Sequence, residues 1–527
     1  MNKILIIATL GLLALSCKKK ATVWDTDWNM PLINDTLFVD AFVNDSTIQE
    51  DPGGYYVLAL DRTLFELGIN DFVEIPDTTI KEEFTLAVPS ITITPGFSFV
   101  NSTEEHELLL NDIQLRKILL KEGKIEMTVK NPIETKAIFT VQLPGVEKDG
   151  IPFLYTFTAP AATNAGAGLT SQTIDLEGYE IDLSGLAGTS YNKLQSNITV
   201  TSDPLGPSVT MTSSDVTIVD ATFKDVRLDY AQGYFKYAFS DTIQRYLKEL
   251  DIYSSGILDL PSTSVAFEVE NGMKVGAEGL LTFLNGTNSA GGTMSLSNNQ
   301  VGSSFNIDPA TGSWGSLTPS IKTLNFNGSN SNVAQFIENL PSTFNLGYSI
   351  DLNPWGNMSG GWDEVFPNSR LKLGLKVDMP LMVGMNDLAL RDTFALSLEQ
   401  DFNKTHVESG RFVLDLDNAF PIGGEVQLIL LDENDQTLEV ISGSTPANGG
   451  QFGQYDALTD LFHANSTVYF DLDEEAVTKL NQLEKVIVHV KMNTIDPANG
   501  TSQQMMIPIG AYLGIKLRAE FKTKNIL

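Results

Sequence analysis

The chain has 527 residues, with 66 acidic and 34 basic side chains and a formal net charge of −32 at pH 7. Such a charge repels nucleic acid and bare anionic membrane, and it favours cations or a basic partner. Apolar residues make up 42% of the chain and charged residues only 19%, a composition that excludes a disordered chain and predicts globular domains.

Residues 1–17 have the pattern of a bacterial lipoprotein signal peptide. Lys3 supplies the positive start, 4–15 form an apolar run, and the run ends close to Cys17, the single cysteine of the chain. The run is too short to span a bilayer. We therefore expect lipid on Cys17 and cleavage before it. The lipid would tether a mature body with a charge near −33, one less than the whole chain because Lys3 is removed.

Three lysines at 18–20 follow the cysteine directly. Surface-exported lipoproteins of Bacteroidota resemble one another in carrying acidic residues at this place, and this chain lacks them. The comparison favours the periplasmic face of the outer membrane, with the cell surface as the alternative. Because Cys17 is consumed by lipid, no thiol is left for a disulfide or a cysteine nucleophile.

A period-two alternation of apolar residues predicts most of the elements behind the anchor. This alternation is clearest in six stretches, namely 125–129, 139–143, 265–269, 371–377, 412–416 and 486–490. It places one face of a strand on a core and the other in water, as in antiparallel sheets. The predicted fold class is all-β, with several antiparallel β-sandwich-like modules and a few short helices.

Strand ends recur along the chain in a loose internal repeat. They fall at Asn131-Pro132, Asn271-Gly272, Met379-Pro380 and Asn418. Asn and Pro both favour a bend after a strand. Because the spacing is irregular, we expect related sandwich modules with insertions and not a solenoid. After the signal peptide we expect an N-terminal leader and β-rich region at 18–115. Two sandwich modules should follow, at 116–225 and at 226–350 with short helices. The last segment, 351–527, should be a β-rich region of one or two modules.

Two stretches carry resemblances to known families. Residues 124–132, followed by the strand at 139–143, resemble the strand, Asn-Pro, strand core of late-embryogenesis-type β-sandwich domains. Residues 24–32 resemble the opening of a group of uncharacterised outer-membrane lipoproteins of Bacteroidota, and the likeness extends over most of the chain. The second resemblance implies an envelope location and brings no catalytic residues with it.

Helices are expected at two places only. Asp241 can cap a helix over 241–250, in which Ile243, Tyr246 and Leu247 lie on one apolar face. A second helix is expected at 332–340. The Gly/Ser/Asn-rich stretch 285–316 is expected to form loops.

Catalytic motifs are sparse in this sequence. Histidine occurs only at positions 106, 406, 463 and 489, so a histidine triad would require distant segments to meet. Phosphate-binding loops, dinucleotide fingerprints and nucleophile elbows are missing from the sequence. We therefore expect no enzyme, no cofactor and no metal. A glycosidase, which needs only two carboxylates, is the enzyme class left open. The Asp415/Asp417 and Asp471/Asp473 pairs could offer oxygen to calcium, but a solvated strand face is favoured.

One aromatic group stands out, in the Gly-rich stretch 355–364. Trp355 and Trp362 could stack on sugar rings, with Asp363 beside them. Indoles also close the ends of sandwiches or anchor protein contacts, and these packing roles are favoured.

The leading functional hypothesis is a non-enzymatic binding or scaffold subunit of an outer-membrane protein assembly. It would be held to the membrane through lipid and would contact an outer-membrane or periplasmic protein. One alternative is a carbohydrate-binding surface lipoprotein that uses the Trp355 and Trp362 loop. Another is a periplasmic carrier of lipid or another apolar ligand.

Overall fold

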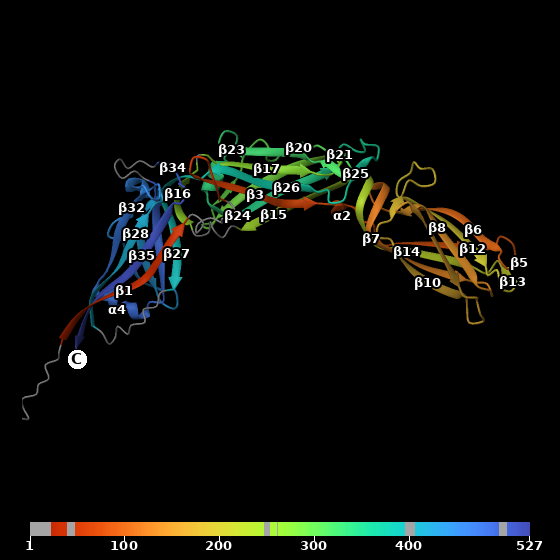
Figure 1. The fold of residues 1–527 in the computed structure, drawn as a ribbon, viewed down its shortest axis with the longest axis horizontal. Coiled ribbons are helices and arrows are strands. Elements are labelled where there is room, and N and C mark those ends of the chain that lie inside the picture. Colours follow the sequence, from red (N-terminus) through yellow and green to blue (C-terminus); the bar gives the residue numbers. More distant parts are fainter. Residues whose placement is uncertain are drawn as a thin grey trace, which may run out of the picture.

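The computed structural model describes residues 23–38, 48–246, 253–260, 262–395, 406–494 and 503–526, and three antiparallel β-sandwiches account for most of them. We call these sandwiches the distal, middle and terminal modules. Figure 1 shows them one after another along the molecule, with the distal module in orange and yellow at one end and the mainly blue terminal module at the other. The all-β prediction is confirmed. Within the described residues, no helix is long and apolar enough to cross a membrane.

The distal module pairs its strands in the orders β4-β14-β7-β10 and β6-β12-β8-β9. These strands are β4 (Thr78–Phe84), β6 (Ser98–Glu107), β7 (Gln114–Asn131), β8 (Ala137–Lys148), β9 (Ile151–Ala159), β10 (Gly168–Asp175), β12 (Lys193–Ser202) and β14 (Thr217–Tyr234). A short strand, β11 (Glu180–Asp182), pairs with both β7 and β8 and so joins the two sheets. The module also holds α2 (Ile69–Phe72) and the pair β5 (Ser90–Ile93) and β13 (Val209–Thr212).

The middle module repeats this arrangement with the orders β3-β26-β17-β23 and β15-β24-β18-β20. These strands are β3 (Tyr56–Leu67), β15 (Tyr237–Tyr246), β17 (Ser264–Asn271), β18 (Ala277–Asn288), β20 (Ser304–Ile307), β23 (Ser320–Asn327), β24 (Pro341–Leu352) and β26 (Leu371–Pro380). Smaller elements complete it: β2 (Ile48–Glu50), β19 (Thr293–Ser295), β21 (Thr311–Ser313), β22 (Ser316–Thr318), α3 (Val333–Glu338) and β25 (Asp363–Val365).

The terminal module has the orders β1-β35-β28-β32 and β27-β33-β29-β30. These strands are β1 (Val23–Phe38), β27 (Met382–Ala395), β28 (His406–Asn418), β29 (Gly423–Leu431), β30 (Thr437–Ser442), β32 (Leu461–Leu472), β33 (Lys485–Asn493) and β35 (Tyr512–Ile526). Its smaller elements are β16 (Tyr253–Asp259), η4 (Gly450–Phe452), β31 (Gln454–Asp456), α4 (Glu474–Lys479), η5 (Leu480–Gln482) and β34 (Met505–Met506).

The three modules are nested within one another. In the sequence, the distal module lies between β3 and β15 of the middle module, and the middle module lies between β1 and β27 of the terminal module, except that β16, which pairs with β27, lies between β15 and β17. In every module the first strand pairs with the last, which closes one sheet. The modules defined by strand pairing therefore differ from the successive segments expected from the sequence, because residues 23–38 pair with residues 512–526.

Each sandwich buries the inward half of its alternating strands. The distal and middle modules share one continuous core, in which Phe139, Phe235 and Phe326 are fully buried. The terminal module has its own core around Phe412 and Phe470. A smaller cluster, which contains Val383 and Met385 of β27 and Ile507 and Ala511 between β34 and β35, lies between the middle and terminal modules.

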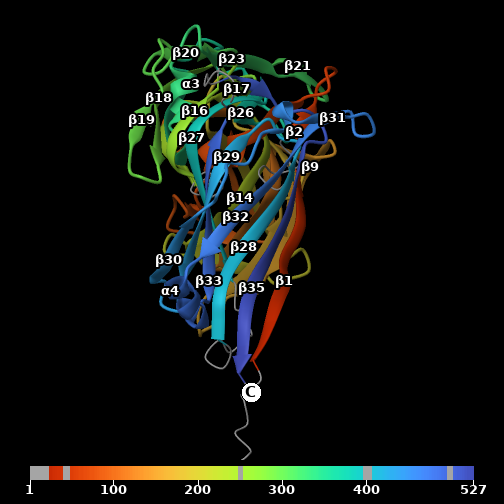
Figure 2. The same cartoon turned by 90° about the vertical axis from the view of Figure 1, so that its left-hand side faces the viewer.

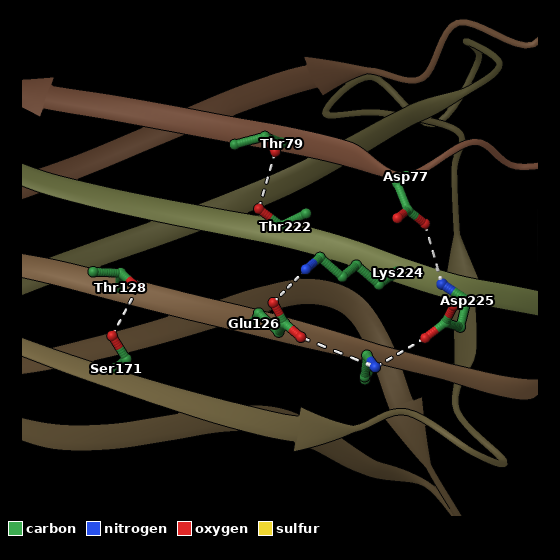
Figure 3. A network of polar contacts seen from close by, with 9 residues as sticks. Asp77, Thr79, Glu126, Thr128, Ser171, Thr222, Lys224 and Asp225 are labelled. Atoms are coloured by element: carbon green, nitrogen blue, oxygen red, sulfur yellow. Dashed lines mark hydrogen bonds and ion pairs between the residues drawn. The ribbon is translucent and has the colours of Figure 1, made fainter.

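The outward half of the alternation is polar, as Figure 3 shows for one sheet of the distal module. Thr79 and Thr222 share a hydrogen bond of 2.9 Å, and so do Thr128 and Ser171. Nearby, the Lys224 ammonium contacts the Glu126 carboxylate at 2.5 Å. Exposed ion pairs of this kind contribute at most about 1 kcal/mol each. Their main effect is to make this face of the sheet polar.

Three of the four predicted strand ends carry the same buried asparagine. Asn131, Asn271 and Asn418 end β7, β17 and β28, and each is at most 4% exposed. In each case the side-chain oxygen accepts from the backbone N–H two residues on. The side-chain nitrogen donates to the carbonyl four residues on and to a second carbonyl 29, 37 or 30 residues away. The repeat therefore reflects one hydrogen-bond set that ties the bend to a distant loop.

The structure corrects two sequence predictions about local structure. The helix expected over 241–250 is wrong for its described part, because β15 extends to Tyr246 and pairs in register with β24. Thr, Ile and aromatic residues suit a half-buried sheet, and this pairing overrides the helical spacing. The helix expected at 332–340 is confirmed as α3. The stretch 285–316 holds several short strands between its turns, because β18 and β20 continue the middle sheet.

We expect Asn131→Ala to lower the free energy of unfolding of the distal module by about 3–4 kcal/mol, because three buried hydrogen bonds are lost and their partners stay buried. Urea unfolding followed by far-ultraviolet circular dichroism would measure this loss of unfolding free energy. Asn101→Ala, on an exposed position of β6 in the same module, is the matched control and should change stability by less than about 0.5 kcal/mol. Equal effects of the two substitutions would contradict the role of the asparagine.

Candidate functional site

The predicted aromatic loop lies where the middle module meets the distal module. Its strand β25 pairs with β14, with Val365 opposite Ala231 and Asp363 opposite Gly233. The loop thereby extends a sheet of the distal module. The side chains that gather here from both modules, which we call the junction cluster, are Arg116, Tyr191, Tyr230, Trp314, Trp362 and Phe366.

Arg116 is held between two aromatic rings of the junction cluster. Its guanidinium carbon lies 4.8 Å from the ring centroid of Trp362 and 4.8 Å from that of Tyr191. The Tyr191 hydroxyl donates to the carbonyl of Gly360 at 3.1 Å. Cation–π contacts contribute about 0.5–2 kcal/mol each. A Cβ on Gly361 would come within 2.6 Å of the Tyr191 ring, so glycine is required for this approach.

The second half of the junction cluster is a group of three aromatic rings that meet at tilted and edge-on angles. Trp314 lies 5.1 Å from Tyr230 and 5.5 Å from Phe366, measured between ring centroids. The Tyr230 hydroxyl donates to Glu364 at 2.9 Å, and Glu364 also pairs with Lys274. Burial and the neighbouring Glu364 carboxylate raise the pKa of Tyr230, so this hydroxyl stays a hydrogen-bond donor.

Asp363 points inward and is only 7% exposed. The side-chain nitrogen of Asn353 donates to the Asp363 carboxylate at 2.8 Å and to the carbonyl of Phe235 at 3.0 Å. Burial raises the pKa of Asp363. The Asp363 carboxylate is therefore part of the junction and does not lie beside the exposed indoles as a sugar ligand would.

The two predicted tryptophans remain exposed, Trp355 at 53% and Trp362 at 59%. One region of Trp362 is covered by Arg116, and Trp355 lies over Gly276, where an added Cβ would be 3.7 Å from the indole. Hydrogen bonds order the loop, because the N–H of Trp362 donates to Ser359. The structure thus places Trp362 at the junction through Arg116, a packing contact that was not visible in the sequence, whereas Trp355 lies on the middle module.

A polar group inside the distal module was missed by sequence reasoning. Glu82 on β4, His106 on β6 and Ser196 on β12 form what we call the polar clasp. The His106 Nε2 atom lies 3.0 Å from Glu82 Oε1 and 2.9 Å from Ser196 Oγ, and Ser196 donates to Glu82 at 2.7 Å. Its signal in the sequence was the charge of Glu82 at an inward position between Ile80 and Phe84.

The polar clasp does not have the geometry of a hydrolase triad. In a triad the two ring nitrogens divide the contacts, one to the serine and one to the acid, whereas here both partners of His106 lie on Nε2. The clasp borders an apolar cavity of about 20 Å³ between the sheets, which is room for one water molecule. Within the described part of the chain, Glu82 Oε2 is buried without a hydrogen-bond partner.

The middle module shows what the fold needs at the same positions. Glu82 lies opposite Val219, which pairs with Val129, two residues before Asn131. In the middle module Phe65 lies opposite Leu373, which pairs with Val269, two residues before Asn271. By the same count along β12 and β24, Ser196 corresponds to Leu346. Because Phe65 and Leu346 pack in an apolar core, the polar clasp is not required by the sandwich.

The other predicted sites are the lipidated cysteine and the acidic pairs. Cys17 lies outside the described residues. The Asp417 carboxylate accepts from Tyr512 and contacts His463, and Asp473 caps α4. Among the described residues, no group of three or more His, Cys, Asp or Glu side chains is placed to hold a metal ion.

Replacing the whole polar clasp by apolar residues, as Glu82→Leu/His106→Leu/Ser196→Ala, should leave the stability of the distal module unchanged or raise it by about 1–4 kcal/mol. His106→Ala alone should lower it by about 1–3 kcal/mol, because Glu82 stays buried and keeps only its hydrogen bond from Ser196. Urea unfolding of the three proteins tests this. A triple variant that is much less stable than His106→Ala would show that the polar clasp stabilises the core.

The raised pKa of Asp363 predicts a pH dependence of stability. The folded state favours the neutral carboxyl, so the stability that this group contributes is complete below about pH 4, its ordinary pKa, and is lost as pH rises through the raised value. Asp363→Asn keeps an acceptor for Asn353 and carries no charge. The melting temperature of the wild type should therefore fall relative to that of Asp363→Asn above about pH 4. A difference in melting temperature between the two proteins that does not change with pH, or that changes in the opposite direction, would contradict this assignment.

Comparisons with known proteins give no family for this chain. No protein-family model matches it, and no curated protein matches it. Among solved structures, a protein described as secreted, from Parabacteroides distasonis, matches over 94% of this chain and 99% of its own, with 11% identity and a TM-score of 0.28. A cryo-EM structure of broad bean stain virus matches over 61% of this chain and 95% of its own, with 11% identity and a TM-score of 0.17. Likenesses this distant assign no function.

Proposed function

We propose that this protein is a lipid-anchored envelope protein that acts as a non-enzymatic binding or scaffold subunit of an outer-membrane protein assembly. The lipid on Cys17 sets its location, and the three modules offer loops and strand edges to other proteins. The periplasmic face of the membrane is favoured by the basic triplet at 18–20.

The pairing of β1 with β35 is the observation that carries this proposal. β1 begins at Val23, six residues after Cys17, and six residues reach at most about 20 Å. From Val23 to Phe38 the strand is paired with β35. A lipid on Cys17 would therefore keep the terminal module close to the membrane. Figure 1 shows the middle and distal modules continuing away from the terminal module, which suits a protein that reaches for partners.

The two alternative functions find less support in the geometry. For a sugar platform, Asp363 is buried and Trp362 is partly covered by Arg116. For a carrier of apolar ligands, the cavity beside the polar clasp has about 20 Å³, far below the several hundred Å³ that ligand sites usually have. A larger hollow of about 370 Å³ over β15, β18 and β24 is lined in part by Ser240, Glu278 and Asp351, which suits an apolar ligand poorly.

The test compares the lipidated protein with Cys17→Ala directed to the same compartment. After a high-salt wash that breaks protein contacts, only the first should stay with the outer membrane. In mild detergent at low salt both should co-purify the same envelope protein, because the contact belongs to the folded body. Interfaces of this class bury about 1,200–2,000 Å² and survive such purification. If neither form retains a protein while the purified body binds glycans or extracts lipid, the scaffold proposal is wrong.

A further inference from the structure

The terminal module carries a small hairpin whose apolar residues are exposed. Strand β31 pairs with the start of β32, with Tyr455 opposite Phe462. Tyr455 is 52% exposed, Phe462 is 53% exposed, and Leu458 at the turn is 95% exposed. Figure 2 shows the β31 hairpin projecting from the body of the module.

The turn of this hairpin is ordered by its own side chains. Asp456 accepts from the N–H of Leu458 at 2.9 Å and from the hydroxyl of Thr459 at 3.3 Å. The hydroxyl of Tyr455 donates to Asp460, and its ring lies 5.3 Å from that of Phe462. Leu458 is therefore presented in a defined position. A group that is already ordered loses less entropy on binding.

We propose that the tip of this hairpin, Tyr455, Leu458 and Phe462, is the contact by which the protein docks into an apolar pocket of a partner protein rimmed by basic side chains. This inference rests on the proposed scaffold function and names its contact surface. Apolar anchors that enter a pocket carry much of the energy of protein interfaces. Asp456 and Asp460 flank Leu458 and would face the basic rim.

The position of the hairpin argues against a membrane as its target. Through Asn418 and Leu513, the start of β32 lies level with Leu37 near the end of β1. That is about 45 Å from Val23 at roughly 3.3 Å per residue, so the hairpin lies far from the anchored end. An anionic membrane surface would also repel the acidic turn.

Charge argues against a second copy of the chain. The protein carries 66 acidic and 34 basic residues, so two copies repel each other. A partner with Lys or Arg around an apolar pocket suits both the acidic turn and the exposed leucine. Association should then slow as salt screens the attraction, over a length of about 8 Å at physiological ionic strength.

The test uses the full-length lipidated protein with the substitution Leu458→Asp and the matched control Leu205→Asp. Leu205 is 94% exposed, and it lies in the distal module. We expect Leu458→Asp to reduce recovery of the envelope partner at least about tenfold, and Leu205→Asp to leave it within about twofold. Because both leucines are exposed, neither change should unfold the protein, and circular dichroism checks this.

A photo-reactive amino acid at position 458 identifies what the tip touches. The proposal expects cross-links to a single partner protein at apolar positions near Lys or Arg, and none from position 205 to that protein. Cross-links to lipid or to a second copy would overturn it. If the wild type retains a partner that Leu458→Asp retains equally, the docking tip is wrong and the scaffold function stands. If the wild type retains no protein, both proposals fail.

Discussion

The architecture depends on pairing the first strand of each module with its last. In the terminal module these strands are β1 and β35, at opposite ends of the chain. Closing such a contact orders a very long intervening segment, so it is slow and comes late in folding. Apart from β25, which pairs with β14, every strand of the distal module's two sheets lies within residues 78–234. We infer that folding proceeds outward from it and that the terminal module closes last.

The three nested modules share one sandwich arrangement and differ in the residues that it does not require. The buried asparagine that ends β7, β17 and β28 is kept in all three modules, because the bend it holds belongs to the sandwich itself. Positions that do not define the sandwich differ. Glu82 belongs to the polar clasp in one module, while Phe65 packs in a core at the same position in the next.

Local patterns in the sequence predicted the strands well. The alternation at 125–129, 265–269 and 412–416 lies in β7, β17 and β28, with the inward residues buried. Asn131, Asn271 and Asn418 were recognisable as strand ends, but their irregular spacing hid the nesting. Partners such as β1 and β35 cannot be read from a local pattern, because pairing between distant segments leaves no periodic signal.

The candidate sites were predictable only in part. Trp355 and Trp362 were singled out as a possible sugar platform, with packing roles favoured, and the contact of Trp362 with Arg116 depends on how two modules meet. Asp363 was expected beside them and turns inward, because β25 pairs with β14. Because of this strand pairing, the loop forms part of a junction between two modules and lacks the carboxylate that a sugar platform would place beside the indoles.

Disulfide formation between β1 and β35 tests the central claim most directly. In a body with Cys17→Ala, Asn34→Cys and Lys516→Cys place two thiols at paired positions of these strands, within the distance that a disulfide needs. Asn34→Cys with Glu520→Cys moves one thiol four residues along β35, roughly 13 Å away. The nested fold predicts rapid oxidation of the first pair and little of the second. Equal oxidation of both pairs, or none of the first, would contradict it.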